Sequence, residues 1–157
     1  MDLSFIESIV PKEHFNTDVS GTPLERAQSL IDQCHPGHTH MKLLQLDGQE
    51  SSAEIPLVQD TRALHGLLHG GVYYTVGDTI TALMCTFHIE NPEQRMVTAS
   101  GSIRYLRAVE SGKVTAKARL KRKEGDRLHF VCDFLNEEGK RAAQAKFLYA
   151  LVTLPGS

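Results

Sequence analysis

The sequence is poor in cysteine, and none of its cysteines forms a pair at the spacing of a metal site. Its three cysteines, Cys34, Cys85 and Cys132, are odd in number, far apart and never part of a CxxC motif. This pattern supports neither a disulfide framework nor a zinc ribbon. It is consistent with a reducing compartment, and we therefore expect a cytoplasmic protein.

Long apolar runs and several familiar motifs are also lacking. No apolar stretch approaches the roughly 20 residues of a membrane-spanning helix. The first residues, MDLSFIESIVPKEH, carry acids where a secretory signal would carry bases. A GxSxG motif, which would indicate a serine hydrolase, does not occur. We expect no membrane partner.

An excess of charge of either sign is missing as well. The 157 residues include 17 basic and 19 acidic side chains, a formal net charge of -2, and 41% of the residues are hydrophobic. Such a balance argues against bulk binding of nucleic acid. A chain of this length buries roughly two thirds of the surface that its unfolded form exposes, which is enough for one self-sufficient core.

The first half of the chain predicts a short helix followed by a hairpin. Residues 22–33 read as a helix, because Thr22 suits the N-cap, Pro23 the first helical position and Glu25 the third residue of a capping box. The Pro36-Gly37 pair then breaks the pattern. Residues 38–47 and 51–59 are predicted as strands joined by a turn at Asp47-Gly48.

A longer helix is predicted over residues 69–87. Five apolar side chains in this segment gather within about 80° on a helical wheel at 100° per residue, which predicts a buried face. They are Val72, Val76, Ile80, Leu83 and Phe87.

The rest of the chain changes to an alternating pattern. One strand is expected near residues 95–107, and three more follow in which apolar and polar residues alternate. Short connectors with glycine, at residues 110–112, 124–126 and 137–139, predict that successive strands are hairpin neighbours. The expected architecture is α+β, with one long helix packed on a curved antiparallel sheet.

The start of the long helix carries the residues of greatest chemical interest. Gly70 and Gly71 leave backbone N–H groups uncovered at a helix N-terminus, which creates a small electropositive site. Asp78 lies about 240° around the wheel from Val72, nearly opposite the apolar face. It could simply belong to a solvated face. Its small neighbours, such as Ala82 and Cys85, instead suggest that another segment packs closely there.

The segment HGGVYYTVGDTITALM resembles the helix entry of hotdog-fold acyl-CoA thioesterases of the PaaI-like branch, in which an acid follows the motif histidine by nine positions. Asp78 follows His69 by nine. The later segment TASGSIRYLRAVESGKVTAKARL is similar to a strand of that family. The resemblance covers about residues 38–153 and implies a helical extension over residues 1–37 followed by a single hotdog domain over residues 38–157.

The resemblance also implies roles for particular residues. The Gly70 and Gly71 N–H groups would polarise the thioester carbonyl, and Asp78 from a neighbouring subunit would act as general base or as nucleophile. Thr98 would position the water or the carboxylate, and His69 would orient the loop or cap the helix. The protein would be a homodimer or a homotetramer, would bind acyl-CoA and would need no metal or other cofactor.

One position departs from the family pattern. Many relatives carry an asparagine six residues before the motif histidine, where this chain has Ala63. His65, from the same loop, is a candidate substitute donor, although a histidine at such a position is more often simply a surface residue. The phosphates of CoA require basic partners. Without such a substrate, the basic residues of these strands would simply form a solvated face. The candidates are Arg104, Arg107, Lys121 and Arg122.

Two other interpretations remain open at this stage. The cluster Cys34, His35, His38 and His40 offers metal ligands, but its Pro-Gly turn and unpaired spacing disfavour a zinc site. The second alternative is a hotdog protein that binds acyl-CoA or an acyl chain without catalysis, because a fold does not guarantee chemistry. Asp78 favours the enzyme, since a pure binding protein has no evident need for a carboxylate at that position.

Overall fold

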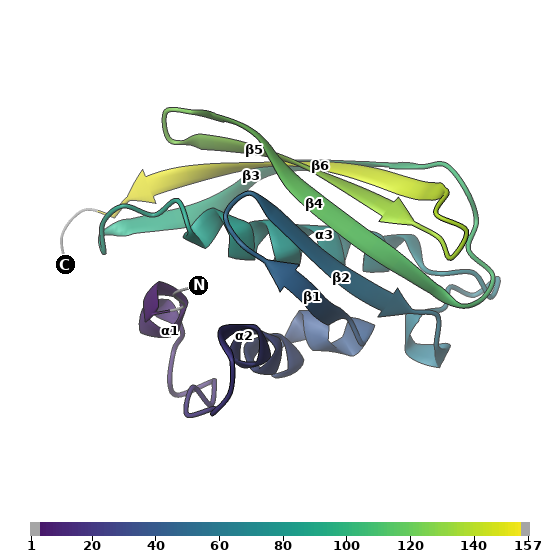
Figure 1. Ribbon diagram of the computed structural model, residues 1–157, viewed down its shortest axis with the longest axis horizontal. Helices are drawn as coiled ribbons and strands as arrows, with labels where there is room; N and C mark the ends of the chain where they lie inside the picture. Colours follow the sequence, from purple (N-terminus) through teal and green to yellow (C-terminus); the bar gives the residue numbers. More distant parts are fainter. Residues whose placement is uncertain (1–3, 155–157) are drawn as a thin grey trace.

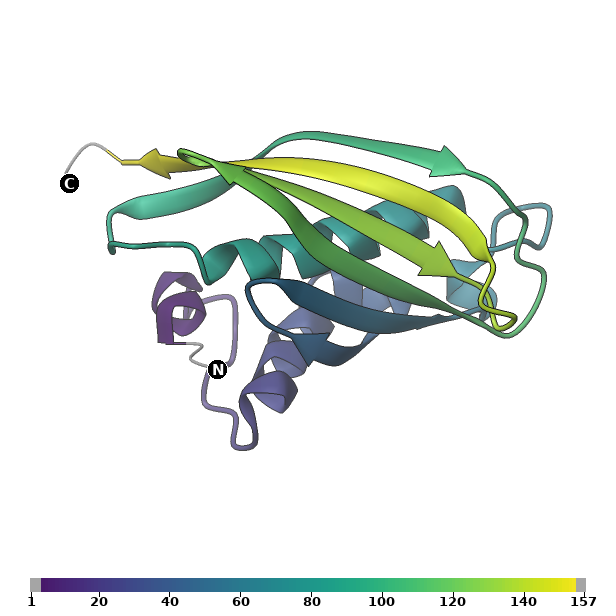
Figure 2. The ribbon, with the colours of Figure 1, turned by 45° about the horizontal axis from the view of Figure 1, so that its top comes forward.

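The computed structural model describes residues 4–154, in which one long helix lies against a six-stranded antiparallel sheet (Figure 1). The sheet curves around the helix, and the first two helices lie on the side of it away from the sheet (Figures 1 and 2). In chain order the elements are α1 (Ser4–Ile9), α2 (Pro23–Asp32), η1 (His35–Thr39), β1 (Lys42–Leu46), β2 (Glu50–Pro56), η2 (Gln59–Thr61), α3 (Gly70–Thr86), β3 (Gln94–Tyr105), β4 (Lys113–Glu124), β5 (Arg127–Leu135) and β6 (Arg141–Thr153). The expected α+β architecture is confirmed.

The long helix α3 is almost the predicted segment, but its buried face is rotated from the predicted one. Val76 and Ile80 are fully buried as expected, whereas Val72, Leu83 and Phe87 are only partly buried. The remaining buried positions are Tyr73, Gly77, Thr81, Met84, Cys85 and Thr86. The rotation follows from the fact that α3 is covered on two sides, by the sheet and by the N-terminal segment.

Gly77 sets the closeness of the contact between α3 and the sheet. A Cβ atom built at this position would lie 2.8 Å from Cε2 of Phe147 and 3.1 Å from Cζ of Phe134. Both rings are buried. A glycine is therefore required here for the helix to reach its observed depth on the sheet.

The strand order of the sheet is β1-β2-β4-β5-β6-β3. The predicted hairpins β1–β2, β4–β5 and β5–β6 are present. The predicted hairpin between β3 and β4 is wrong, because β3 pairs with β6 at the opposite edge and β4 pairs with β2 and β5. The linker of residues 106–112 carries the chain across the end of the sheet between these two positions.

Asp133 on β5 anchors a charged network on the outer face of the sheet. Its carboxylate accepts hydrogen bonds from Arg119 at 2.9 Å and Gln144 at 2.7 Å, and it pairs with Arg141 at 2.9 Å. Burial by itself raises the pKa of this carboxyl group, but these hydrogen bonds and positive charges outweigh it, so the pKa lies below its usual value.

The N-terminal segment packs onto the core and contributes buried residues to it. The predicted capping box of α2 is present, with Glu25 N–H donating to Thr22 Oγ1 at 3.3 Å and Thr22 N–H donating to Glu25 Oε2 at 2.7 Å. Ala27 and Ile31 of α2 and Ile6 of α1 belong to the buried core. Helix α1 was not predicted as an individual element, although it lies within the helical extension expected over residues 1–37.

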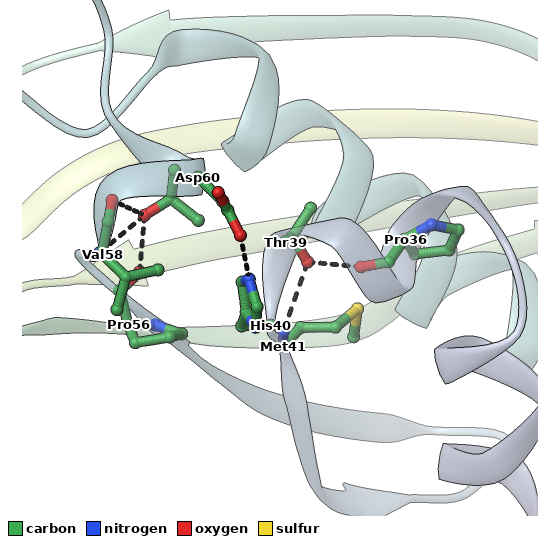
Figure 3. Close-up of polar contacts among 8 residues, drawn as sticks. Pro36, Thr39, His40, Met41, Pro56, Val58 and Asp60 are labelled. Carbon is green, nitrogen blue, oxygen red and sulfur yellow. Dashed lines mark hydrogen bonds and ion pairs between the residues drawn. The ribbon is translucent and has the colours of Figure 1, made fainter.

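The strand predicted over residues 38–47 begins only at Lys42, since residues 35–39 form the short helix η1. Thr39 Oγ1 donates to the Pro36 carbonyl at 2.6 Å, and His40, at φ 54°, lies 2.7 Å from a carboxylate oxygen of Asp60 (Figure 3). Within residues 4–154, no helix is both long and apolar enough to cross a membrane.

Candidate active site at Asp78 and the start of α3

Asp78 lies where two neighbouring strands direct hydroxyl groups at one carboxylate oxygen. Thr98 of β3 and Tyr149 of β6 are directly paired across the strands. Tyr149 donates its phenol hydrogen to Asp78 Oδ1 at 2.6 Å, and Thr98 Oγ1 donates to the same oxygen at 3.2 Å. The structure thus brings together two of the residues named from the sequence, Asp78 and Thr98, within one chain.

A β-bulge adjoins this site. The β3–β6 register shifts between Thr98 and Ser100, so that Ala99 faces no partner residue on β6. Bulges of this kind redirect side chains and are frequent next to active sites. Here the bulge follows the residue that contacts Asp78, at the point where β3 passes alongside α3.

Tyr149 is the residue that sequence reasoning missed. Its side chain is 1% exposed, and its hydroxyl also lies 2.8 Å from the Asp78 carbonyl and 3.0 Å from Thr81 Oγ1. Burial, and next the hydrogen bond to Asp78, raise the pKa of Tyr149 far above its usual value, so the phenol keeps its proton and acts as a donor. The sequence did contain a signal for Tyr149. The alternating pattern of the last strand predicts that Tyr149 faces the core, and a buried tyrosine hydroxyl needs a hydrogen-bond partner.

The other part of the site is the N-terminus of α3, where His69 is the N-cap. The Gly71 N–H donates to His69 Nδ1 at 2.9 Å, so this N–H group is already used by the cap. A neutral His69 ring with an accepting Nδ1 carries its proton on Nε2. Within residues 4–154, the backbone N–H of Gly70 donates to no backbone carbonyl. The Gly70 carbonyl accepts from Tyr105 at 2.8 Å.

A cavity of about 420 Å³ opens beside the start of α3. His65 and Arg107 both contribute to its wall, together with Gly70. Ala63 closes the turn that carries His65, with its N–H donating to the Leu67 carbonyl at 2.8 Å and its carbonyl accepting from Gly66 at 2.8 Å. The loop before α3 thus contributes an imidazole, and the linker after β3 a guanidinium, to the same space as the helix N-terminus.

The helix start and the carboxylate do not meet within one chain. Gly70 and Asp78 are separated by eight residues of the same helix, which corresponds to about 12 Å along its axis. Asp78 lines a different cavity, of about 570 Å³, between α3 and the N-terminal segment. Reacting groups must approach to about 3–3.5 Å, so one copy of the chain cannot bring both features to a single carbonyl group.

The four basic residues named from the sequence fall into separate places. Arg107 lies by the start of α3 and donates from Nη1 to the Arg141 carbonyl at 2.7 Å. Lys121 and Arg122 line a cavity of about 410 Å³ next to Lys146, and Arg122 pairs with Glu124 at 2.6 Å. Arg104 is exposed on β3, opposite Gln144.

The cysteine and histidine cluster of residues 34–40 is divided among different partners. His35 Nε2 lies 3.3 Å from Thr75 Oγ1, and His40 contacts Asp60 (Figure 3). Cys34 donates its thiol to the Leu30 carbonyl at 3.4 Å. Across the described part of the chain, no three side chains among His, Cys, Asp and Glu are grouped so as to hold a metal ion.

A family model for the thioesterase superfamily matches residues 65–143, which is half of the chain and includes the α3 entry, Asp78 and Thr98. The chain belongs to the thioesterase superfamily. The hotdog fold expected from the sequence is confirmed by the six-stranded antiparallel sheet on one long helix and by the family match. No curated protein matches the sequence closely enough to count as a relative.

Many solved structures have a fold similar to that of this chain. A thioesterase from Haemophilus influenzae is 24% identical, with 87% of this chain and 95% of that chain aligned at a TM-score of 0.78. A mutant thioesterase from Pseudomonas aeruginosa is 21% identical, with 88% and 100% aligned at 0.79. A hypothetical thioesterase from Streptococcus pneumoniae, solved with coenzyme A, is 20% identical, with 74% and 88% aligned at 0.64. At these identities the likeness establishes the fold.

Proposed function

We propose that this protein is an acyl-CoA thioesterase that hydrolyses a thioester to a free acid and CoA, with Asp78 as the catalytic carboxylate. The observation that carries the proposal is the Asp78 carboxylate itself, which is held by Tyr149 and Thr98 and borders an apolar cavity. Such hydrogen bonds fix the orientation of a carboxylate before substrate arrives. The CoA complex of the Streptococcus pneumoniae relative supports the choice of CoA.

Two chemical routes use the same carboxylate. As a general base, Asp78 takes a proton from water while the water oxygen bonds to the acyl carbon, the C–S bond breaks and CoA leaves as a thiolate that is then protonated. As a nucleophile, Asp78 first displaces the CoA thiolate to form a mixed anhydride, which water then opens. In both routes the oxyanion needs a donor, for which we propose the uncapped Gly70 N–H. His69 caps α3 and so holds this loop in place.

We further propose that the working unit is a homodimer, or a homotetramer built from dimers. The distance of about 12 Å between Gly70 and Asp78 supports a site in which Asp78 of one copy serves the α3 start of the other. The outer edge of β3 has no strand partner among residues 4–154, and an unpaired edge is a natural place for strand pairing between two copies. Large apolar side chains exposed on or directly after β3 support the same arrangement. They are Val97, Tyr105 and Leu106.

The basic residues are proposed to bind the CoA phosphates. Arg107, with His65 beside it, is the candidate nearest to the α3 start, whereas Lys121, Arg122 and Arg104 lie farther out on the sheet. Exposed charges are screened by salt, so the KM for acyl-CoA is expected to rise with ionic strength. Arg107→Glu and a Lys121→Glu/Arg122→Glu double variant would identify the group responsible, by the size of the KM change that each produces.

The test of the proposal is thiol release from a panel of acyl-CoAs that differ in chain length and include aromatic acyl groups. Asp78→Asn is expected to abolish release while the protein stays folded, and Asp126→Asn, at an exposed hairpin carboxylate, serves as the matched control. Full activity of Asp78→Asn would refute the assignment. Binding of acyl-CoA by the wild type without release would favour the non-catalytic alternative.

Complementation tests whether two copies share the site. A Cβ atom added at Gly70 would lie 2.9 Å from Tyr105 Oη, so Gly70→Val crowds and disables the helix entry. If the site is shared, a mixed dimer of Gly70→Val and Asp78→Asn chains regains one intact site. Mixing the two inactive proteins under exchange conditions should then restore up to about a quarter of wild-type activity, because half of the dimers are mixed and each holds one site of two. No recovery despite exchange of subunits would overturn the shared site.

A further inference from the structure

The N-terminal segment and α3 form the walls of an apolar cavity, and Asp78 lies on its α3 wall between Tyr74 and Leu83. The cavity measures about 570 Å³, within the usual range of small-molecule sites. We call it the N-terminal pocket. Its walls come from α1, α2 and the segment after α2 on one side, and from α3 and β3 on the other. Figures 1 and 2 show both N-terminal helices on the side of α3 away from the sheet.

The chemistry of the pocket walls is uneven. Most of the lining is apolar, with Val10, Leu30 and Leu83 among the contributors, and the polar side chains that α3 contributes are Asp78, Tyr74 and two threonines. None of the described residues that line the pocket is Lys or Arg. The pocket is therefore unsuited to phosphate groups and suited to a hydrocarbon whose one polar end lies at Asp78.

Polar contacts hold the N-terminal wall of the pocket in place. They connect α1 to α2, and α2 to the residues at the start of β1. Arg26 of α2 forms an ion pair with Glu7 of α1. Gln28 of α2 accepts from the Leu43 N–H at 2.7 Å and donates to the Met41 carbonyl at 3.0 Å. These contacts hold α1 on α2, and α2 on the start of β1.

We propose that the N-terminal pocket binds the aliphatic acyl chain of the thioester substrate, and that the N-terminal segment thereby sets the preferred chain length. This inference rests on the proposed function, since it places the acyl carbon next to Asp78. Each methylene that enters an apolar pocket strengthens binding by about fourfold. The kcat/KM is thus expected to rise with chain length until the pocket is full.

The test fills the pocket from two walls. Leu30→Trp enlarges a partly buried side chain on α2, and Leu44→Trp is the matched control at an exposed leucine on β1. The ratio of kcat/KM for dodecanoyl-CoA to that for butanoyl-CoA is expected to fall at least tenfold in Leu30→Trp and to stay within twofold in Leu44→Trp. Ala82→Leu fills the pocket from α3 and should lower the ratio in the same direction, which covers the case that Leu30→Trp does not fold. Unchanged ratios in folded pocket variants would overturn the proposal.

A binding experiment separates this inference from the proposed function. The chain contains no tryptophan, so Phe15→Trp introduces a single fluorescent reporter on the pocket wall. Titration with dodecan-1-ol, a neutral probe whose hydroxyl group can donate to Asp78, should shift its emission saturably, and adding Ala82→Leu should weaken the binding at least fivefold. Binding without any thioesterase activity would leave the pocket assigned and refute the enzyme. Hydrolysis without binding of dodecan-1-ol, or a change of oligomeric state as the only effect of filling the pocket, would refute the pocket and leave the enzyme.

Discussion

The hydrogen bond from Tyr149 to Asp78 should couple the two residues in both stability and catalysis. Tyr149→Phe removes a hydroxyl that is 2.6 Å from Asp78 Oδ1 and keeps the buried ring in place. A hydrogen bond to a charged group contributes about 1.5–3 kcal/mol, and its loss leaves Thr98 as the remaining side-chain donor to that oxygen. We expect the free energy of unfolding to fall by about 2 kcal/mol, or roughly 4–8 °C in Tm.

The catalytic effect should appear in kcat and not in KM. A carboxylate that has lost its main orienting donor moves out of line, and a misplacement of about 1 Å can cost about 100-fold in rate. We expect kcat to fall about 10- to 100-fold, while KM changes by less than about threefold, because Tyr149 is buried behind Asp78 and does not reach the substrate. A merely structural role would lower the stability and leave the kcat of the folded fraction unchanged.

A double-mutant cycle measures the coupling directly. Urea unfolding of the wild type, Tyr149→Phe, Asp78→Ala and the double variant should give a coupling energy of about 1.5–3 kcal/mol. Tyr73→Phe is the matched control, because Tyr73 of α3 is buried as Tyr149 is, but its ring packs edge-on against Phe134. Its coupling to Asp78 should be below about 0.5 kcal/mol. An equally small coupling for Tyr149 would refute the reasoning.

Three other substitutions test individual parts of the fold. His69→Ala should cost about 0.5–2 kcal/mol as a lost N-cap, and His69→Ser should restore most of it; equal stabilities in thermal melts would remove the capping role. Gly77→Ala should destabilise by about 1–2 kcal/mol in urea unfolding despite the better helix propensity of alanine, because the new Cβ meets Phe147; a gain in stability would contradict the close packing. Asp133 has a lowered pKa, so its stabilisation is present above about pH 4 and is lost as the pH falls further. Asp133→Asn should flatten this acid-induced loss in pH-dependent melts, and an unchanged slope would refute it.

The local features of the fold were readable from the sequence because short-range interactions determine them. The capping box of α2 and the start of α3 at His69 follow from side chains that lie within three residues of the groups they cap. The three alternating strands follow from the pleat, which turns every second side chain to the core. Asp78 was located by its spacing from His69 along one helix, which needs no knowledge of the sheet.

The position of β3 in the sheet could not be predicted from the sequence. The glycine at residue 112 suggested a hairpin, but residues 106–112 can extend to about 23–25 Å, whereas three strand spacings amount to about 14 Å. The linker is therefore long enough to cross the end of the sheet. Nothing local distinguishes this crossing from a wide turn, and the choice is made by the pairing of β3 with β6.

The sequence by itself determined the two longer helices and the approximate positions of the strands, although not α1 or η1, and it showed that a carboxylate follows a glycine-rich helix start. Only the tertiary structure decided what surrounds that carboxylate. Tyr149 lies 71 residues from Asp78 and contacts it because β3 and β6 are paired in this register. The N-terminal helices are the segment that covers the face of α3 beside Asp78, where small side chains indicated close packing but could not say by which segment. The physical reason is that register and packing join distant segments through contacts that no local pattern encodes.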